Sequence, residues 1–480
     1  MFSVTVSIAL GLLVLAWVAS GAIAAAHAVM YKREPRSSGL WALLCIFLPF
    51  VGAWLYWALG INRVERKIVK RLGRRDRPYD PAEVLLAAAS AGVAPTPQNL
   101  VPLRTVADRV TRLPLLPGNR IVPLHAGENA YPRMLDAIRG ATQSVTLASY
   151  IFDWDDVGRE FVQTLSDAAR RGVRVHALLD GVGALESFSR VGRRLLRAGA
   201  QVSAFFPLRF PLGRVRVNLR NHRKILVVDG RLGFTGGMNI SARHLMQSNN
   251  PRRADDLHFE ITGPVVSEMQ HAFVEDWSLA TDQVLDGEAY FPPLPPTGGA
   301  LCRGISSGPD EPFEILHWIL QAAFSSAQHS VRVVTPYFAP TTALIAAMVT
   351  ASLRGVKITI ILPSMVDLRF MRWVADAYLW QLLEHGITVY RQPPPFAHTK
   401  LLIVDEQWIL LGSANLDPRS LRLNFEFNVE TYDAALAANL SRDLDRTVAP
   451  LTPVTLAELD ARPKWRRFRD GLAKTLSPHL

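Results

Sequence analysis

Residues 221–230 read NHRKILVVDG, and residues 397–406 read AHTKLLIVDE. Each stretch has a histidine, a lysine two positions later and an aspartate five positions after the lysine. Each is followed by two small residues and an asparagine. The two copies keep one offset at six positions (398 − 222 = 176), so chance does not explain them. The matched residues are His222, Lys224, Asp229, Gly236, Gly237 and Asn239 in the first copy, and His398, Lys400, Asp405, Gly412, Ser413 and Asn415 in the second.

The chain around the two copies alternates strand-like and helix-like segments. The segments that match between the halves are 144–153 with 330–339, 157–172 with 341–355, 173–180 with 356–363, and 199–204 with 386–391. Such alternation is typical of α/β folds, and its repetition predicts two copies of one unit. We therefore expect a duplicated α/β fold whose two lobes form one site about a pseudo-twofold axis.

The N-terminus predicts a membrane anchor. Residues 2–30 and 37–62 contain no Asp, Glu, Lys or Arg, and about 20 apolar residues suffice to span a bilayer. We expect a transmembrane helical hairpin, with Pro49 kinking the second helix. A cleaved signal peptide is the alternative for the first run. The absence of Lys and Arg before that run, and the second run directly after it, argue against cleavage.

Basic residues flank both apolar runs and predict the orientation of the hairpin. The short connector carries Lys32, Arg33 and Arg36, and the stretch 63–77 carries eight Lys and Arg residues. The positive-inside rule then places residues 63–480 in the cytoplasm and the connector outside. The basic stretch 63–77 either contacts anionic lipid headgroups or serves only as a topology signal.

Length and composition set the remaining bounds. The chain has 480 residues, a formal charge of +11 and two cysteines, which excludes a disulfide framework and a Cys-rich zinc site. The positive charge favours an anionic partner. The predicted divisions are 1–62, two transmembrane helices; 63–120, a basic juxtamembrane segment and linker; 121–297, the first lobe; and 298–480, the second lobe with a basic amphipathic tail.

The repeated motif carries its own chemistry. If its apolar run is a strand, His222 and Lys224 share one face, and Asp229 points to the other face and is structural; the second copy behaves alike. Together the lobes supply two histidines, two lysines and the amides of Asn239 and Asn415. This set suits a phosphoryl group held without a metal or another cofactor. Two imidazoles suit double displacement, in which one attacks phosphorus and the other transfers protons.

Each histidine also needs an acceptor that fixes its tautomer. The candidates are Asp256 and Glu426, one downstream of each motif copy; the alternative is that both are surface carboxylates. Gly237 and Ser413, with the two asparagines, lie in the turns expected to approach the bound phosphate.

The chain resembles the phospholipase D superfamily, through both H-x-K-x4-D motifs, and within it the bacterial cardiolipin synthases. The further similarity covers nearly the whole chain and includes FLPFVGAWLYWALGINR, YIFDWDDVGREF, VTPYFAP and HTKLLIVDEQWILLGSANLDPRSLRLNFE. The resemblance implies a bacterial inner-membrane enzyme that transfers a phosphatidyl group between two phosphatidylglycerol molecules and releases glycerol. It also implies that His222 is the nucleophile and His398 the general acid and base. Gly237 departs from the serine that the family often has there.

Several alternatives stay open. Water could be the acceptor, as in a phospholipase or nuclease, although a nuclease needs no membrane hairpin and no nucleic acid is expected as partner. Phosphatidylethanolamine could be the second substrate, and a non-catalytic scaffold would not need both complete motifs. The sequence does not indicate the oligomeric state.

The repeat fails at one place, directly before the first motif. Val202 and His222 are 20 positions apart (222 − 202), but Val389 and His398 only 9 (398 − 389), so the first half has an 11-residue insertion. The insertion falls within residues 203–220, which contain Phe205, Phe206, Leu208, Phe210 and Leu212, with Arg209, Arg214 and Arg216. We expect it to dock the pocket on the membrane; the alternative is that these side chains pack against the domain.

Overall fold

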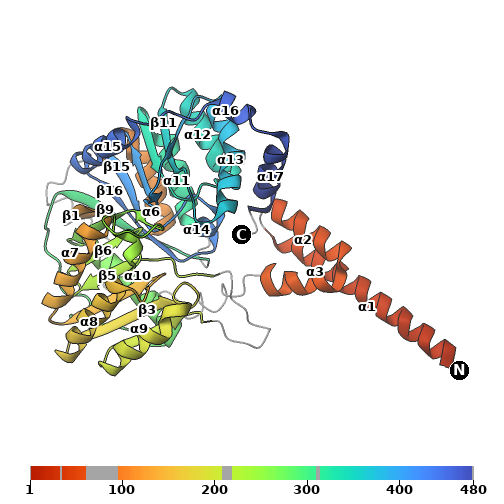
Figure 1. The fold of residues 1–480 in the computed structure, drawn as a ribbon, viewed down its shortest axis with the longest axis horizontal. Coiled ribbons are helices and arrows are strands. Elements are labelled where there is room, and N and C mark those ends of the chain that lie inside the picture. Colours follow the sequence, from red (N-terminus) through yellow and green to blue (C-terminus); the bar gives the residue numbers. More distant parts are fainter. Residues whose placement is uncertain (1, 33–34, 61–95, 208–218, 310–313, 478–480) are drawn as a thin grey trace.

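The computed structural model describes residues 2–32, 35–60, 96–207, 219–309 and 314–477, as an N-terminal group of helices and a larger α/β part (Figure 1). The N-terminal elements are α1 (Phe2–Tyr31), α2 (Pro35–Phe47), α3 (Pro49–Leu55) and the π-helical turn η1 (Tyr56–Gly60). The basic stretch 63–77 lies outside the described residues.

One 14-stranded sheet forms the centre of the α/β part. Lobe 1 contributes β1 (Leu116–His125), β2 (Ser144–Ser149), β3 (Arg174–Asp180), β4 (Gln201–Phe205), β5 (Ile225–Val228), β6 (Leu232–Gly236) and β8 (Leu257–Thr262). Lobe 2 contributes β9 (Ala300–Ser307), β10 (Ser330–Val334), β11 (Lys357–Pro363), β12 (Thr388–Gln392), β14 (Leu401–Val404), β15 (Trp408–Gly412) and β16 (Glu426–Tyr432). The order is β12-β11-β10-β14-β15-β16-β9-β1-β8-β6-β5-β2-β3-β4, so the lobes meet where β1 pairs with β9 and corresponding strands follow in the same order towards each edge.

Helices cover both faces of this sheet (Figure 1). They are α6 (Val101–Thr111), α7 (Ala126–Gly140), α8 (Asp156–Arg170), α9 (Leu185–Arg197) and α10 (Val266–Thr281), then α11 (Ile315–Ser326), α12 (Thr342–Leu353), α13 (Arg369–Glu384), α14 (Pro418–Arg422), α15 (Ala434–Val448), α16 (Leu456–Asp460) and α17 (Lys464–Leu476). Helices α7, α8 and α9 bury an apolar core on one face of lobe 1, and α6, α11, α12 and α13 do so in lobe 2. A third core, with α10 and α15, runs across both lobes.

The alternating pattern is confirmed. The four predicted pairs of strand and helix segments are β2 with β10, α8 with α12, β3 with β11, and β4 with β12. The apolar part of each motif is also a strand, β5 or β14. His222 and Lys224 were expected on that strand, but β5 begins only at Ile225, because the preceding residues pair with the other lobe.

The second apolar run differs from the expected continuous helix. Ser38 Oγ donates to Ala28 O (3.2 Å), a Cβ on Gly21 would overlap Cys45 O, and His27 Nδ1 lies 2.7 Å from the Tyr56 hydroxyl. Helix α2 therefore runs back along α1, and the chain then returns through α3 to the level of His27 in α1. The reversal is at Leu48–Pro49, where proline ends α2 and opens α3. Pro49 is the break that was predicted, but the break is a full reversal rather than a kink.

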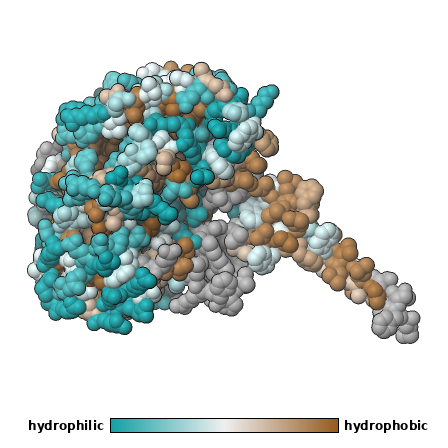
Figure 2. All heavy atoms as spheres, viewed as in Figure 1, coloured by the Kyte–Doolittle hydropathy of each residue, from teal (hydrophilic) through white to brown (hydrophobic). Residues whose placement is uncertain are grey.

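One helix of the described residues, Ile8–Tyr31, has the length and hydropathy to cross a membrane, and Ser37–Phe47 is a shorter apolar helix. The free part of α1 exposes large apolar side chains, such as Leu10 (65%) and Leu15 (68%). Figure 2 shows this apolar surface as a projection from a mostly polar α/β part. Such exposure is typical of a helix in an apolar environment and is consistent with membrane association of α1.

The first residues of the stretch that was expected to dock on the membrane pack differently from that expectation. Phe205 is fully buried at the end of β4, with its ring 4.3 Å from that of Phe206 and 4.9 Å from that of Phe425. These two phenylalanines therefore pack against the domain, Phe205 fully buried and Phe206 partly buried. Residues 208–218, which include Phe210 and the three arginines, lie outside the described residues.

Candidate active site

Each motif histidine lies on a segment that crosses to the opposite lobe. The His222 amide donates to Phe425 O (2.9 Å), and the Phe425 amide donates to Arg220 O (2.8 Å). In the other direction, β13 (Phe396–Ala397) pairs with β7 (Ala254–Asp255), and the His398 amide donates to Asp255 O (2.7 Å). Because Asp256 and Glu426 follow these partner segments, each histidine is brought to a carboxylate of the other lobe.

The two histidine–carboxylate pairs are therefore crossed. His222 Nδ1 lies 3.0 Å from Glu426 Oε2, and His398 Nδ1 lies 2.7 Å from Asp256 Oδ2. Glu426 is 0% and Asp256 2% exposed, so neither is the surface carboxylate that the sequence left possible. A carboxylate that accepts Nδ1–H leaves the lone pair on Nε2, which suits nucleophilic attack or proton transfer.

The two carboxylates are supported differently. Glu426 accepts from Ser413 Oγ (2.5 Å) and from Asn424 Nδ2 (3.2 Å). In lobe 1 the residue that corresponds to Ser413 is Gly237, and a Cβ there would overlap the Asp256 carboxylate. The glycine thus makes room for that carboxylate. The Ser413 hydroxyl contacts Glu426, so the departure at Gly237 changes the support of a carboxylate.

Lys224 and Lys400 are buried beside the histidines, 3% and 4% exposed. Each ammonium donates to the backbone carbonyl of its own motif histidine, Lys224 to His222 O at 2.7 Å. Burial lowers the pKa of Lys224 to about 7 and that of Lys400 to about 8. Both lysines are therefore poised to lose or hold a proton according to whether an anion is present.

Burial also lowers the pKa of both histidines. For His398 the pKa is well below its usual value, because Lys400, Lys224 and His222 add repulsion to the burial. For His222, Glu426 opposes the lowering by burial. Burial favours protonated Glu426, but the contacts with His222, Lys224 and Ser413 together outweigh it, and the pKa of Glu426 stays below its usual value. The site thus holds an ionised carboxylate and a neutral His222.

A cavity of about 510 Å³ opens at this point and is lined by residues of both lobes. His222, His398, Asn239 and Asn415 line it together, so the structure brings the predicted histidines and asparagines to one space. Further lining residues are Tyr150, Arg220, Arg243, His244, Tyr337, Asp367, Leu368, Met371 and Arg419. The ring of Tyr150 lies edge-on to His222, 5.1 Å between centroids.

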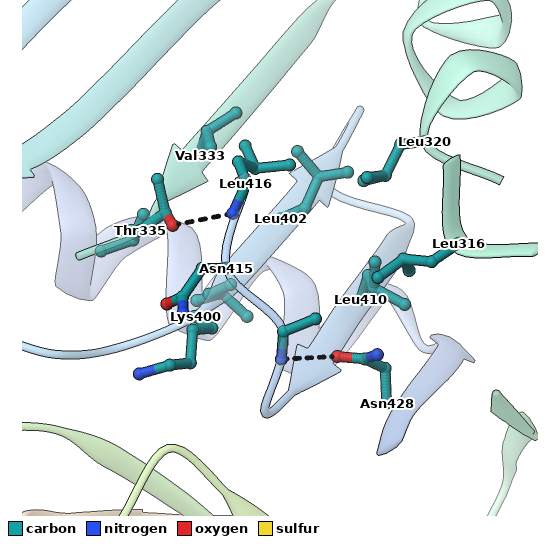
Figure 3. Close-up of a pocket in the computed structure, with 13 residues that line it drawn as sticks. Leu316, Leu320, Val333, Thr335, Lys400, Leu402, Leu410, Asn415, Leu416 and Asn428 are labelled. Carbon is teal, nitrogen blue, oxygen red and sulfur yellow. Dashed lines mark hydrogen bonds between the residues drawn. The ribbon is translucent and has the colours of Figure 1, made fainter. Parts of the chain in front are cut away.

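The turns that carry the asparagines are fixed from behind. In lobe 2 the Ala414 amide donates to Asn428 Oδ1 (3.3 Å) and the Leu416 amide to Thr335 Oγ1 (3.2 Å), which holds Asn415 between them (Figure 3). A small apolar cavity of about 30 Å³ lies behind this turn, and the Lys400 side chain points away from it in Figure 3. In lobe 1 the Ile151 amide donates to Asn239 Oδ1 (3.2 Å).

The motif aspartates lie away from the cavity. Asp229 accepts from the amides of Thr142, Gln143 and Ser144, and Asp405 accepts from those of Gln328, His329 and Ser330. Asp229 and Asp405 both occupy left-handed backbone (φ 51° and 52°) directly after their strands. Each therefore ties its motif strand to the start of the neighbouring strand, which is the structural role that side-chain alternation predicted.

Two arginines of the cavity were not predicted from the sequence, although the constant offset of the repeat relates them to each other. Arg243 and Arg419 line the cavity and are related by the offset of the motifs (419 − 243 = 176). The tyrosines Tyr150 and Tyr337 also line it; they were matched as part of the fold repeat but not as site residues. No group of three or more His, Cys, Asp or Glu residues among the described residues has the arrangement of a metal site.

Comparison with known proteins shows what the whole chain is similar to. A family model described as "Cardiolipin synthase, PLD-like domain" matches residues 134–277 and 320–448, and one described as "Phospholipase_D-nuclease N-terminal" matches residues 22–60. Cardiolipin synthase A of Pseudomonas aeruginosa (strain PAO1) is 32% identical over 98% of this chain and 96% of that protein. Cardiolipin synthase of Staphylococcus aureus (strain Mu50) is 31% identical over 94% and 93%.

Among solved structures, a phosphatidylserine synthase from Haemophilus influenzae superposes with a TM-score of 0.62 at 16% identity, and covers 79% of this chain and 100% of its own. At that identity the likeness concerns the fold alone.

The lysine pKa values predict how anion binding depends on pH. We expect each lysine to hold an anion only while it is protonated, so the affinity for an anion should be highest below the lysine pKa values and fall as pH rises through about 7 to 8. We expect the inhibition constant of dimethyl phosphate, a monoanion throughout this range, to rise at least about tenfold between about pH 6 and pH 9.

Lys224→Ala should bind this anion more weakly and with a shallower pH dependence. Lys357→Ala, which changes an exposed lysine outside the cavity, should behave as the wild type. Inhibition that is constant across the pH range would contradict the assignment of the lysines to anion binding.

Proposed function

The chain belongs to the cardiolipin synthases of the phospholipase D superfamily, and we propose that it transfers a phosphatidyl group from one phosphatidylglycerol molecule to another through a covalent histidine intermediate. The observation that carries this proposal is the pair of crossed histidine–carboxylate contacts around one cavity. A related pseudo-twofold arrangement of the lobes is supported by the strand order, which reads alike from both edges.

In the first step Nε2 of His222 attacks the phosphorus of the donor lipid. The bond from phosphorus to the headgroup glycerol breaks, and His398 supplies a proton to the departing oxygen. The free site keeps His398 neutral, but the negative charge of a bound phosphodiester offsets the two lysines, and so raises the His398 pKa towards the value that an acid needs. The products are glycerol and phosphatidyl-His222.

In the second step His398 removes the proton from the primary hydroxyl of the acceptor lipid. The oxygen attacks phosphorus, the phosphorus–nitrogen bond breaks, and His222 regains its lone pair. Glu426 stabilises the charge that develops on His222, and Asp256 does the same for His398. Lys224, Lys400, Asn239 and Asn415 hold the phosphoryl oxygens. The residues named for these roles need neither a metal nor another cofactor, and metal-independent turnover remains a prediction.

Hydrolysis by water is the second candidate, and phosphatidylethanolamine is a possible second substrate. The membrane association of α1 favours lipid substrates. Vesicles of pure phosphatidylglycerol, and of phosphatidylglycerol mixed with phosphatidylethanolamine, separate these cases by mass spectrometry of the products. Cardiolipin and glycerol in equal amounts from pure phosphatidylglycerol support the transferase, whereas phosphatidic acid as the main product supports the hydrolase.

Substitution of the histidines tests the division of roles. His222→Ala should abolish both cardiolipin formation and the covalent adduct, because no other group supplies the nucleophile. His398→Ala should slow turnover by about 10²–10⁴-fold, as expected for loss of acid–base catalysis. Under neutral to alkaline conditions, intact-protein mass spectrometry should detect any phosphatidyl adduct on the His398 variant. His329→Ala, at an exposed histidine, is the matched control. Full activity of either motif variant would refute the two-histidine mechanism.

The proposed placement is the bacterial inner membrane, with the lobes in the cytoplasm. The contacts of α2 and α3 support one span, α1, and a re-entrant pair that leaves the membrane on the side it entered. On this topology Lys32, Arg33, Arg36 and the basic stretch 63–77 all lie on the side of the lobes, as the positive-inside rule requires. The connector is then cytoplasmic, whereas a two-span hairpin would place it outside.

Single engineered cysteines distinguish the two topologies. We expect Glu34→Cys to react with a membrane-impermeant maleimide only in inside-out vesicles, and Ser3→Cys only in right-side-out vesicles. The native Cys45 and Cys302 are fully buried, so the unmodified chain gives the background. Labelling of position 34 from the outside would establish the two-span hairpin instead.

A further inference from the structure

The two ends of the cavity differ in their basic residues. On the His398 side, His244 lies 6.1 Å from the His398 ring, between centroids, and Arg243 precedes it. The Arg243 charge acts on both His398 and Tyr337. On the His222 side, Arg220 and Arg419 act on Tyr150, whose ring contacts His222. The position that corresponds to Arg220 in the second motif is Phe396 (396 − 220 = 176), so Arg243 is the lining arginine that acts on the His398 side.

Arg243 is anchored in a way that leaves its guanidinium able to bind an anion. Its Nε donates to Arg252 O (3.1 Å), and among the described residues its terminal nitrogens make no ion pair with a carboxylate. The side chain is half-buried at the cavity wall, where an anion would be partly shielded from water. A guanidinium in such a place binds a phosphodiester through two parallel hydrogen bonds.

The proposed reaction requires such a group on this side. An acceptor phosphatidylglycerol brings its hydroxyl to His398, and its own phosphate then lies one glycerol unit away. Lys224 and Lys400 are engaged with the reacting phosphoryl group. The acceptor phosphate therefore needs a separate cation near His398, and glycerol or water as acceptor would need none.

We propose that Arg243 binds the phosphate of the acceptor lipid while the hydroxyl of that lipid is held at His398. This assignment rests on the proposed transferase function. It makes Arg243 a residue that selects a phospholipid acceptor over glycerol and water, and it gives the two histidine sides of the cavity different ligands.

Comparison of two acceptors in one assay tests this assignment. Vesicles of phosphatidylglycerol with labelled glycerol in solution report cardiolipin formation and glycerol exchange from the same phosphatidyl-enzyme. For Arg243→Gln, the ratio of cardiolipin to exchanged glycerol should fall about tenfold or more, while exchange stays within about twofold of the wild type. Arg243→Lys, which keeps the charge, should give an intermediate ratio, and Arg252→Gln, at an exposed arginine, the wild-type ratio.

The outcomes distinguish failure of the Arg243 assignment from failure of the proposed transferase function. Equal loss of both products in Arg243→Gln, or an unchanged ratio, would overturn the acceptor role of Arg243. Absence of glycerol exchange and of cardiolipin in the wild type would instead overturn the proposed function itself.

A second inference concerns the exposed surface of α17 and rests on observations independent of Arg243. Helix α17 exposes an apolar stripe of Trp465 (60%), Phe468 (75%), Leu472 (52%) and Leu476 (40%). Their spacing of three and four residues places them on one face of the helix. The opposite face packs on α13 through buried Ala473 and through stacking of Arg469 on Trp373 (4.4 Å) and Lys474 on Tyr378 (4.4 Å).

The charges of α17 indicate what covers this stripe. The helix carries Lys464, Arg466, Arg467, Arg469 and Lys474 against the single acidic residue Asp470. Large exposed aromatic side chains flanked by Lys and Arg are typical of helices that lie in the headgroup layer of anionic membranes. The chain is already held at a membrane by α1, and α17 faces the N-terminal helices in Figure 1.

Exposed apolar side chains also lie next to the cavity. Met365 (60%) and Leu368 (57%) are exposed just before α13, the helix on which α17 packs. Leu368 and Met371 line the cavity itself. Helix α17 therefore packs on the helix whose N-terminal end lines the cavity, where apolar side chains are also exposed.

We infer that α17 lies in the headgroup layer of the anionic leaflet and holds the cavity opening there. The double variant Trp465→Ser/Phe468→Ser should then lose at least about fivefold turnover on phosphatidylglycerol vesicles and keep its turnover on a short-chain soluble phosphatidylglycerol. Equal losses on both substrates would assign the stripe to folding or catalysis.

A physical measurement complements the activity. A fluorophore on Phe468→Cys should be quenched by brominated phosphatidylglycerol in vesicles that contain the full chain. A fluorophore on Asp156→Cys, at a 91% exposed side chain of α8, should not be quenched. Absence of quenching at position 468 would overturn the inferred membrane contact.

Discussion

The crossed contacts between histidines and carboxylates are the constraint on which the rest of the structure depends. Glu426 and Asp256 are almost completely buried, and an ionised carboxylate without a partner is costly at such a place. Each has its histidine on the other lobe, so the contacts that a lobe gives its own carboxylate are completed by the other lobe. The pairing of β1 with β9 and the short ladder of β7 with β13 keep the lobes in the register that these contacts need. Integrity of the sheet and assembly of the site are thus one requirement.

The duplicated halves have diverged where their chemistry would differ. Glu426 is the longer acid and accepts from Ser413, whereas Asp256 is shorter and occupies space that Gly237 leaves open. Arg220 on one side corresponds to Phe396 on the other. These exchanges keep the backbone geometry and change the charge and the support around each histidine. A reaction that forms an intermediate on one side and activates an acceptor on the other benefits from such asymmetry, because the two steps place different demands on the two imidazoles.

The repeated motif made the α/β fold, the paired strands and four cavity residues, His222, Asn239, His398 and Asn415, predictable from sequence, because the constant offset between the copies identifies equivalent residues before the fold is known. The partners Asp256 and Glu426 were predicted as candidates, but the crossing was not, because it depends on backbone pairing between residues far apart in the chain. Arg243 and Arg419 were missed although they share the offset, since arginine near a motif is common on surfaces. The reversal at Leu48–Pro49 was also missed: a run of apolar residues shows hydrophobicity and length, and a proline shows where a helix ends, but neither shows the direction in which the next helix leaves.

On the proposed topology, the reversal at Leu48–Pro49 would give the membrane-bound part a consistent electrostatic arrangement. A second full span would separate Lys32, Arg33 and Arg36 from the basic stretch 63–77 by the thickness of the bilayer, and would place one positive cluster on each side. With the proposed re-entrant pair, both clusters would lie on the side of the lobes, and the basic residues of α17 would add to them. Positive charge gathered on one leaflet attracts the anionic lipids that the cavity would use, within the short range that salt allows. The charge that orients the chain in the membrane would therefore also raise the concentration of substrate where the two lobes meet.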